Sequence, residues 1–80
     1  MIEVENLNYE KNVLYVLLFI YHNDYESSNN VEVIGIFDSL TLAEKADIYF
    51  KKSEYYINIL NDYDIVATSI THKTLNTIEY

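Results

Sequence analysis

The strongest constraint on the fold is the run Val13–His22 (VLYVLLFIYH), in which nearly every residue is apolar. β-branched and aromatic residues dominate this run, which is typical of a β-strand. Successive side chains of a strand point to opposite faces, so both faces of this strand are apolar and it belongs in the middle of a sheet. One face is aliphatic (Leu14, Val16, Leu18, Ile20), and the other is richer in aromatic residues (Val13, Tyr15, Leu17, Phe19, Tyr21).

A strand, a turn and a helix are predicted from the next apolar stretch. Residues 31–37 form the strand, and the only glycine of the chain, Gly35, predicts a bulge or a close approach by the helix that follows. Asp38 and Ser39 can cap this helix, and the segment Thr41–Glu44 fits a capping box, so two starting points remain open. Apolar residues then recur at helical spacing as far as residue 50.

The remaining segments are a loop, an ambiguous stretch and a third strand. Residues 23–30 (NDYESSNN) predict a polar hairpin loop, and residues 63–71 (YDIVATSIT) predict the third strand. Residues 53–62 fit either a continuation of the helix or an extended segment. We favour continuation to about residue 60, because neither glycine nor proline interrupts it.

These elements predict an α+β fold with the order ββαβ. A right-handed return through the helix places the third strand beside the first, which gives an antiparallel sheet of order 2-1-3. One helix covers one face only, and we assign it to the aliphatic side. The opposite side then stays open and is predicted to be a homodimer or partner interface, formed by Tyr15, Leu17, Phe19 and Tyr21.

Length and composition predict one small domain over residues 1–80, with 1–12 and 72–80 as loose ends or edge segments. The chain has no cysteine, which excludes disulfides and thiolate zinc sites and fits a reducing cytoplasm. Its acidic first residues do not resemble a signal peptide, and the longest apolar run is too short to cross a bilayer. We therefore expect a cytoplasmic protein.

Thirteen acidic residues against five basic ones give a formal net charge of −8, and no arginine is present. Such a surface repels phosphate groups, so direct binding to nucleic acid or to an anionic membrane is disfavoured. A protein partner with a basic surface is the partner that this charge favours. The alternative reading is that the acidity only keeps a small protein soluble.

The segment IGIFDSLTLAEKA (residues 34–46) resembles the "IGvFsS…eAe.A" strand-turn-helix signature of a family of small, uncharacterised bacterial and phage domains. The likeness covers about residues 13–71 and implies the ββαβ fold, but no activity. Where that family has an aromatic–glycine segment before its last strand, this chain has SEYYINILND (residues 53–62).

Patterns typical of catalysis or metal binding are weak. His22, Asp24 and Glu26 lie close in sequence, but the EF-hand spacing with its glycine is absent. Ser27, Ser28 and Ser69 lack the surroundings of a nucleophile, and no glycine-rich loop could hold a phosphate. We expect no enzyme activity, no metal and no cofactor.

The predicted topology places the hairpin loop and the C-terminal end of the helix at one end of the domain. This gathers acidic and aromatic residues into a candidate partner-binding site: Asp24, Tyr25, Glu26, Glu54, Tyr55, Tyr56, Asp62, Tyr63 and Asp64. Tyrosines supply contact area at low entropic cost, and carboxylates pair with lysine or arginine. The alternative is a solvated loop end with some tyrosines turned into the core.

Three functions are compatible with these features. The first is an acidic protein-binding module, such as a phage or mobile-element inhibitor that covers the basic nucleic-acid-binding surface of a host defence nuclease, as an anti-CRISPR protein or DNA mimic does. The second is a structural or regulatory bacterial domain that forms a homodimer through its open sheet face. The third is an immunity or antitoxin protein for a basic nuclease toxin.

Overall fold

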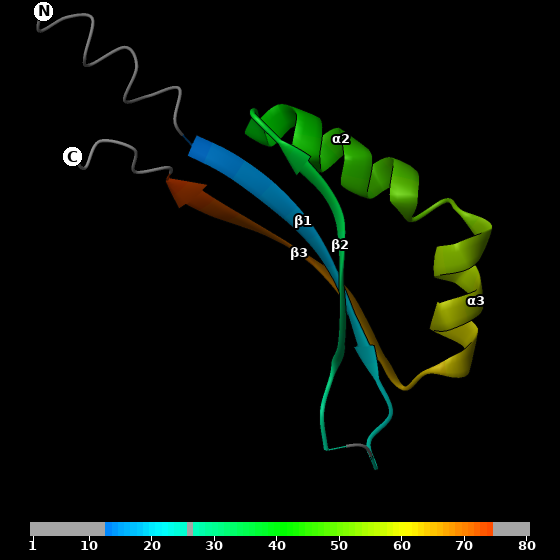
Figure 1. Ribbon diagram of the computed structural model, residues 1–80. Helices are drawn as coiled ribbons and strands as arrows, with labels where there is room; N and C mark the ends of the chain where they lie inside the picture. Colours follow the sequence, from blue (N-terminus) through cyan, green and yellow to red (C-terminus); the bar gives the residue numbers. More distant parts are fainter. Residues whose placement is uncertain (1–12, 26, 75–80) are drawn as a thin grey trace, which may run out of the picture.

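The computed structural model describes residues 13–25 and 27–74 as a three-stranded antiparallel sheet with two helices (Figure 1). The sheet order β2-β1-β3 and the α+β class are those predicted, with the apolar strand in the centre. The elements in chain order are β1 (Val13–His22), β2 (Asn30–Phe37), α2 (Leu40–Phe50), α3 (Glu54–Asp62) and β3 (Ile65–Thr74).

The strand register fixes which side chains share a face. Leu17 of β1 pairs with Gly35 of β2 and with Ile70 of β3, and the neighbouring Leu18 pairs with Val33 and Ser69. The β1–β2 register shifts between these two positions, so Ile34 has no partner and forms a bulge. A bulge at this glycine-containing stretch was predicted, and it increases the local twist of the edge strand.

The predicted single helix is two helices, because Ser53 ends one and begins the other. The Ser53 hydroxyl donates to the carbonyl oxygen of Phe50 at 2.6 Å, and its Oγ accepts from the backbone N–H of Tyr56 at 3.2 Å. Such a cap competes with continued helical hydrogen bonding even where no proline or glycine interrupts the chain. Another serine, Ser39, caps the beginning of α2: its Oγ accepts from the backbone N–H of Leu42.

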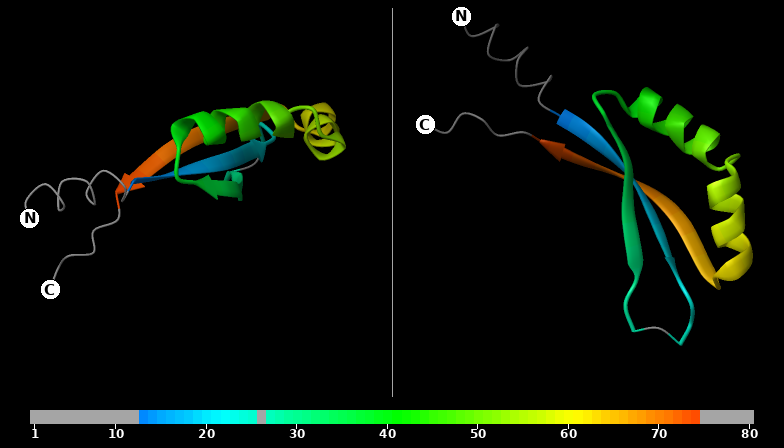
Figure 2. Two further views of the ribbon diagram at one scale, coloured as in Figure 1. Left: turned by 90° about the horizontal axis from the view of Figure 1, so that it is seen from above. Right: turned by 45° about the vertical axis from the view of Figure 1, so that its right-hand side comes forward.

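Both helices lie on one side of the sheet, which is the side that carries the aromatic residues of β1 (Figure 2). Leu17 and Phe19 are fully buried there, and Tyr21 is nearly so. The Phe19 ring packs edge-on against Phe50 of α2, with centroids 4.9 Å apart, and lies 5.7 Å from the ring of Tyr56 in α3. This aromatic cluster is the core of the described domain.

The prediction that the helix covers the aliphatic side was therefore wrong. The face proposed for dimerisation is the covered one, since the helix rings stack on Phe19 and leave no room for a partner there. A strand that is apolar on both faces does not reveal which face its own helix takes. The residues that this correction concerns are Tyr15, Leu17, Phe19 and Tyr21.

The open side of the sheet, which we call the aliphatic face, continues across all three strands. By the strand pairing, its apolar residues are Leu14, Val16, Leu18 and Ile20 of β1, Val31, Val33 and Ile36 of β2, and Ile65 and Ala67 of β3. The later residues of β3 on this face, Ser69, Thr71 and Lys73, are polar. Val33 and Ile36 are each 60% exposed. The expectation of an open apolar sheet face thus holds for the side opposite to the one predicted.

The bounds of the last strand differ from those predicted, since β3 begins two residues later and extends to Thr74. Of the two alternatives for the segment after residue 71, a loose end or an edge segment, His72–Thr74 is the second, because it is paired with β1 at the edge of the sheet. The expectations for residues 1–12 and 75–80 lie outside the described residues. In the part of the chain that the structure describes, neither helix has the length and apolar character needed to cross a membrane.

Candidate functional site

The β1–β2 loop and the α3–β3 turn are tied together at one end of the domain. The backbone N–H of Asp24 donates to Oδ2 of Asp64 at 3.0 Å, and the backbone N–H of Asp64 donates to Oδ1 of Asn23 at 3.1 Å. These reciprocal hydrogen bonds join positions about forty residues apart in the chain. They bring the loop and the end of the second helix together, as the predicted topology required.

The loop and the turn carry exposed side chains here, and Asp62 is the last residue of α3, two positions before Asp64. We call four exposed residues the acidic end: Asp24, Tyr25, Asp62 and Asp64. Tyr25 is 83% exposed, and its hydroxyl accepts from the amide of Asn23 at 3.2 Å. Asp64 uses one carboxylate oxygen on the neighbouring loop and still faces solvent. The arrangement offers carboxylates and one aromatic ring to a partner from two segments whose positions are fixed relative to each other.

The other predicted site residues do not join this group. Tyr56 belongs to the core, with its ring 5.6 Å from that of Phe50. Tyr63 packs its ring edge-on against Tyr21 at 4.9 Å and is only partly exposed. Glu54 and Tyr55 lie at the opposite, N-terminal end of α3, and Glu26 lies outside the described residues. The predicted nine-residue site therefore separates into an exposed end and a set of packing tyrosines.

A carboxylate that sequence reasoning missed, Glu32 of β2, organises part of that packing. Its Oε2 accepts from the hydroxyls of both Tyr21 and Tyr55, each at 2.6 Å. These bonds favour the ionised form, so the hydrogen bond from Tyr21, followed by that from Tyr55, lowers the pKa of Glu32 below its ordinary value. The same contact with Glu32 raises the pKa of the Tyr21 phenol and of the Tyr55 phenol.

One sequence signal could have located Glu32. It pairs with the buried Phe19, so it lies on the covered face, where an unpaired carboxylate would be costly. A charged residue on the covered face of a strand needs donors nearby, and tyrosines were the available donors in a chain without arginine. The contact is structural, since both hydroxyls and the carboxylate satisfy one another.

Metal chemistry has no support among the described residues. Within residues 13–25 and 27–74, no three His, Asp or Glu side chains are placed to hold a metal ion. The ring nitrogen Nδ1 of His22 lies 3.1 Å from the backbone oxygen of Asn23, which is a local contact within the loop.

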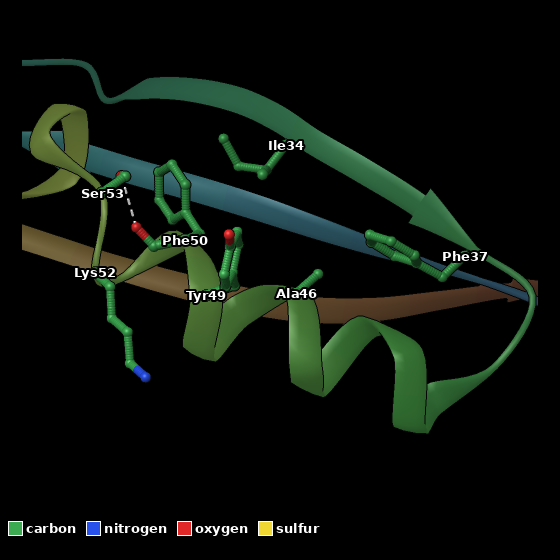
Figure 3. A pocket seen from close by; sticks show the side chains of 7 residues that line it. All are labelled: Ile34, Phe37, Ala46, Tyr49, Phe50, Lys52 and Ser53. Atoms are coloured by element: carbon green, nitrogen blue, oxygen red, sulfur yellow. Dashed lines mark hydrogen bonds between the residues drawn. The ribbon is translucent and has the colours of Figure 1, made fainter.

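A cavity of about 540 Å³ opens between β2 and α2 (Figure 3). Its lining is mainly apolar and comprises Ile34, Phe37, Ala46, Tyr49, Phe50, Lys52 and Ser53. The Lys52 side chain extends away from the cavity, and the Ser53 hydroxyl is engaged with the carbonyl oxygen of Phe50. The cavity therefore presents a mainly apolar surface between β2 and α2.

The ring of Phe37 in this cavity explains the single glycine of the chain. A Cβ at Gly35 would lie 2.6 Å from Cζ of Phe37, on the covered face of the sheet. The close approach predicted from the glycine therefore comes from a neighbouring aromatic ring, whereas a helix was expected. A ring over a strand glycine restores the packing that the missing side chain would provide.

The substitution Gly35→Ala is expected to lower the free energy of unfolding by about 1–3 kcal/mol, since the Phe37 ring must move out of its position. Urea denaturation measures the loss. The control is the same substitution in a Phe37→Leu background, where the clashing ring atom is absent and the loss should shrink. An equal loss in both backgrounds would show that the ring is not the cause.

Comparison with protein-family models, with curated proteins and with solved structures finds no match for this chain. The resemblance to small bacterial and phage domains stays a prediction.

Proposed function

We propose that this chain is a non-catalytic, acidic protein-binding module whose acidic end binds a basic surface of another protein. One observation carries the proposal. Asp24, Tyr25 and Asp64 are exposed on two segments that hydrogen bond to each other, so the site is ordered before a partner arrives. Ordering before binding reduces the entropic cost of association.

The charge distribution supports a basic partner. Whole elements separate the acidic end from the lysines next to it in sequence. Lys52 lies beyond α3, a nine-residue helix about 13 Å long, and Lys73 lies at the other end of β3. Lys51, beside Lys52, is already paired with Asp47 at 3.5 Å. A net charge of −8 also accelerates the encounter with a cationic surface at low salt.

The more specific form of the proposal is an inhibitor, encoded by a phage or mobile element, that acts in the bacterial cytoplasm. Its carboxylates would occupy the basic groove that a host defence nuclease uses for nucleic acid. An immunity or antitoxin protein for a basic nuclease toxin would use the same surface and the same chemistry. The two differ in the identity of the nuclease, and binding measurements against each class separate them.

The proposal predicts that Asp24→Asn/Asp62→Asn weakens binding to a basic nuclease roughly tenfold, because two charge pairs at an exposed interface contribute about 0.5–1 kcal/mol each. Both substitutions leave Asp64 and its hydrogen bonds in place. The probes are purified CRISPR effector nucleases and nuclease toxins, titrated calorimetrically at low and high salt. Affinity should fall as the salt concentration rises.

The matched control is Asp38→Asn/Glu44→Gln, which removes the same number of charges from exposed positions outside the acidic end. This variant should bind within about twofold of the wild type if the location of the charge matters. Equal weakening by both double variants would reduce the effect to net charge and would contradict a defined site. Failure to bind any basic nuclease would contradict the proposal itself.

The alternative role, a domain that associates with itself, is favoured by a different surface. The aliphatic face lies on the open side of the sheet, whereas the acidic end is formed by the loop and turn at its tip. The two surfaces can be tested separately.

A further inference from the structure

The aliphatic face is continuous and lacks carboxylates. Among the described strand residues that point to this side, the only ionisable ones are His22 and Lys73, at opposite ends of the sheet. The acidic residues of the strands, helices and connections lie elsewhere: Glu32 is on the covered face, and Asp24 and Asp64 are at the tip. In a chain with a net charge of −8, a face without carboxylates is a marked local exception.

Depletion of charge is what distinguishes the centre of a protein interface from the rest of a surface. The face is also apolar where it is most exposed, since Val31 is 56% exposed and Val33 and Ile36 are each 60% exposed. Scattered exposed aliphatic residues are ordinary, but a set that spans three adjacent strands forms one patch.

The packing within the described residues does not compensate for this exposure. The fully or nearly fully buried side chains are Leu17, Phe19, Tyr21 and Ala43, all on the helix-covered side of the domain. Small domains have little core from which to draw stability, and association is a common way to add burial. Covering the aliphatic face would turn a sheet with one packed side into the centre of a two-sheet sandwich.

We infer that the aliphatic face is covered by the same face of a second copy of this chain. A basic partner would find no carboxylate there, whereas an aliphatic, nearly uncharged surface is complementary to itself. Two sheets pack face to face about 10 Å apart, with side chains of both inner faces interleaved. Homodimers most often have two-fold symmetry, in which one patch contacts its own copy.

The charges at the two ends of the sheet select one orientation. Leu18 is near the middle of β1. A two-fold axis that lies between the two sheets, next to Leu18 and perpendicular to the strands, makes the strands of the two copies antiparallel. Lys73 of each copy then lies over the end of the partner copy that carries Asp24 and Asp64. The other two-fold arrangement, with parallel strands, would bring the two Lys73 ends together.

The size of the face is that of a small interface. Strands of eight to ten residues, at about 3.3 Å per residue and about 4.8 Å between strands, give a projected footprint of roughly 14 by 30 Å. Small interfaces are typical of weak and transient complexes, so we expect a dissociation constant on the order of micromolar.

Sedimentation velocity of the full chain from 1 to 100 μM should show a monomer–dimer equilibrium that does not weaken as salt is raised. The variant Val33→Lys/Ile36→Lys should be monomeric throughout, with at least a hundredfold loss of self-affinity. The control Leu42→Lys/Ile48→Lys adds the same charge on α2, at positions that are 49% and 60% exposed, and should dimerise like the wild type. Circular dichroism confirms that each variant is folded.

A second measurement tests the orientation without depending on the lysine variants. The chain has no cysteine, so Leu18→Cys introduces a single thiol near the two-fold axis, where a short bismaleimide should link two copies across the roughly 10 Å between the sheets. Leu14→Cys should remain unlinked, because antiparallel strands place it over His22 of the other copy, and Ile48→Cys, on the helix, should also remain unlinked. A wild type that is monomeric at 100 μM, or equal loss of dimer in both lysine variants, would overturn the inference. Dimers that are linked through Leu14→Cys, or not linked through Leu18→Cys, would overturn the arrangement.

These measurements do not depend on the proposed binding to a basic nuclease. Salt screens both the attraction of Lys73 for the other copy's acidic end and the mutual repulsion of two chains of net charge −8, so self-association is expected not to weaken as salt rises, whereas binding through the acidic end falls with salt. Each hypothesis can therefore fail while the other stands.

Discussion

The substitution Phe19→Ala is expected to lower the free energy of unfolding by about 3–5 kcal/mol, which is the cost of deleting a fully buried aromatic side chain. Phe19 is 0% exposed, and four aromatic rings lie around it. A domain of this size is stable by about 4–12 kcal/mol at the usual average per residue. The variant should therefore lose a large part of the stability of the domain, from about a quarter to all of it.

The rings around Phe19 come from three elements, which is why one substitution has so large an effect. Phe50 ends α2, Tyr55 and Tyr56 begin α3, and Tyr21 is on the same strand. Their centroids lie 4.9 to 6.0 Å from that of Phe19, in tilted or edge-on orientations that add to the value of simple burial. Removing the central ring leaves a cavity that none of the four can fill alone.

Urea denaturation of the wild type and Phe19→Ala gives the difference in free energy. The matched control is Tyr49→Ala, which also removes an aromatic ring but from a position that is 80% exposed on α2. Its effect should lie within about 0.5 kcal/mol of zero. Comparable losses at the two positions would contradict the location of the core on the helix-covered side.

The substitution Glu32→Gln should lower stability by about 1–2 kcal/mol at neutral pH, since hydrogen bonds to an ionised acceptor are about twice as strong as those to a neutral one. Both tyrosine hydroxyls would keep an acceptor of similar shape, but without its charge. Tyr21 has more to lose than Tyr55, because it is nearly buried, whereas Tyr55 is 44% exposed and can reach water.

The pH dependence of this difference has a definite sign. Hydrogen bonding lowers the pKa of Glu32 in the folded state from its ordinary 4.5, so the unfolded chain takes up the proton first as the pH falls. The stabilisation is complete above the ordinary pKa and is lost as the pH falls through the folded-state pKa. The raised pKa of the Tyr21 phenol gives a pH dependence of the opposite sign. Its contribution to the free energy of unfolding is complete below pH 10.0, the ordinary pKa of the phenol, and is lost as the pH rises above that value.

Urea denaturation of the wild type and Glu32→Gln between pH 3 and pH 8 tests this account. The gap between the two proteins should narrow below about pH 4.5, because only the wild type loses the charged acceptor. Subtracting one protein from the other removes the contribution of the remaining carboxylates. A gap that stays constant through the acidic range would show that Glu32 does not stabilise the fold through its charge.

The arrangement of strands was predictable from sequence because each strand has a distinct pattern. The run Val13–His22 allows only a central position, and the short polar loop after it requires a hairpin. The first helix was predicted with two possible starting points, of which the structure has the Ser39 cap. These features depend on local chemistry, which a single sequence records well.

The covered face and the break between the helices were not predictable in the same way. Both faces of β1 are apolar, so the periodicity of its sequence does not show which face the helices cover. The register that places Gly35 opposite Leu17 is set by contacts between distant parts of the chain. Ser53 fits an uninterrupted helical stripe and is equally suited to cap a new helix. The acidic end was partly predictable, since the predicted topology places Asp24 and Asp64 at the same end of the domain. The packing of Tyr56 in the core was not predictable, because it depends on the residue at which α3 begins.

Ser53 has a consequence for how the domain opens. Since its hydroxyl closes the hydrogen-bond ladder of α2 and starts that of α3, loss of helical structure in one is not passed along the backbone to the other. The nine residues of α3 are attached to the sheet and to Phe50 of α2 chiefly through the rings of Tyr55 and Tyr56. Transient detachment of this short helix would give solvent brief access to Phe19 while the three strands stay paired.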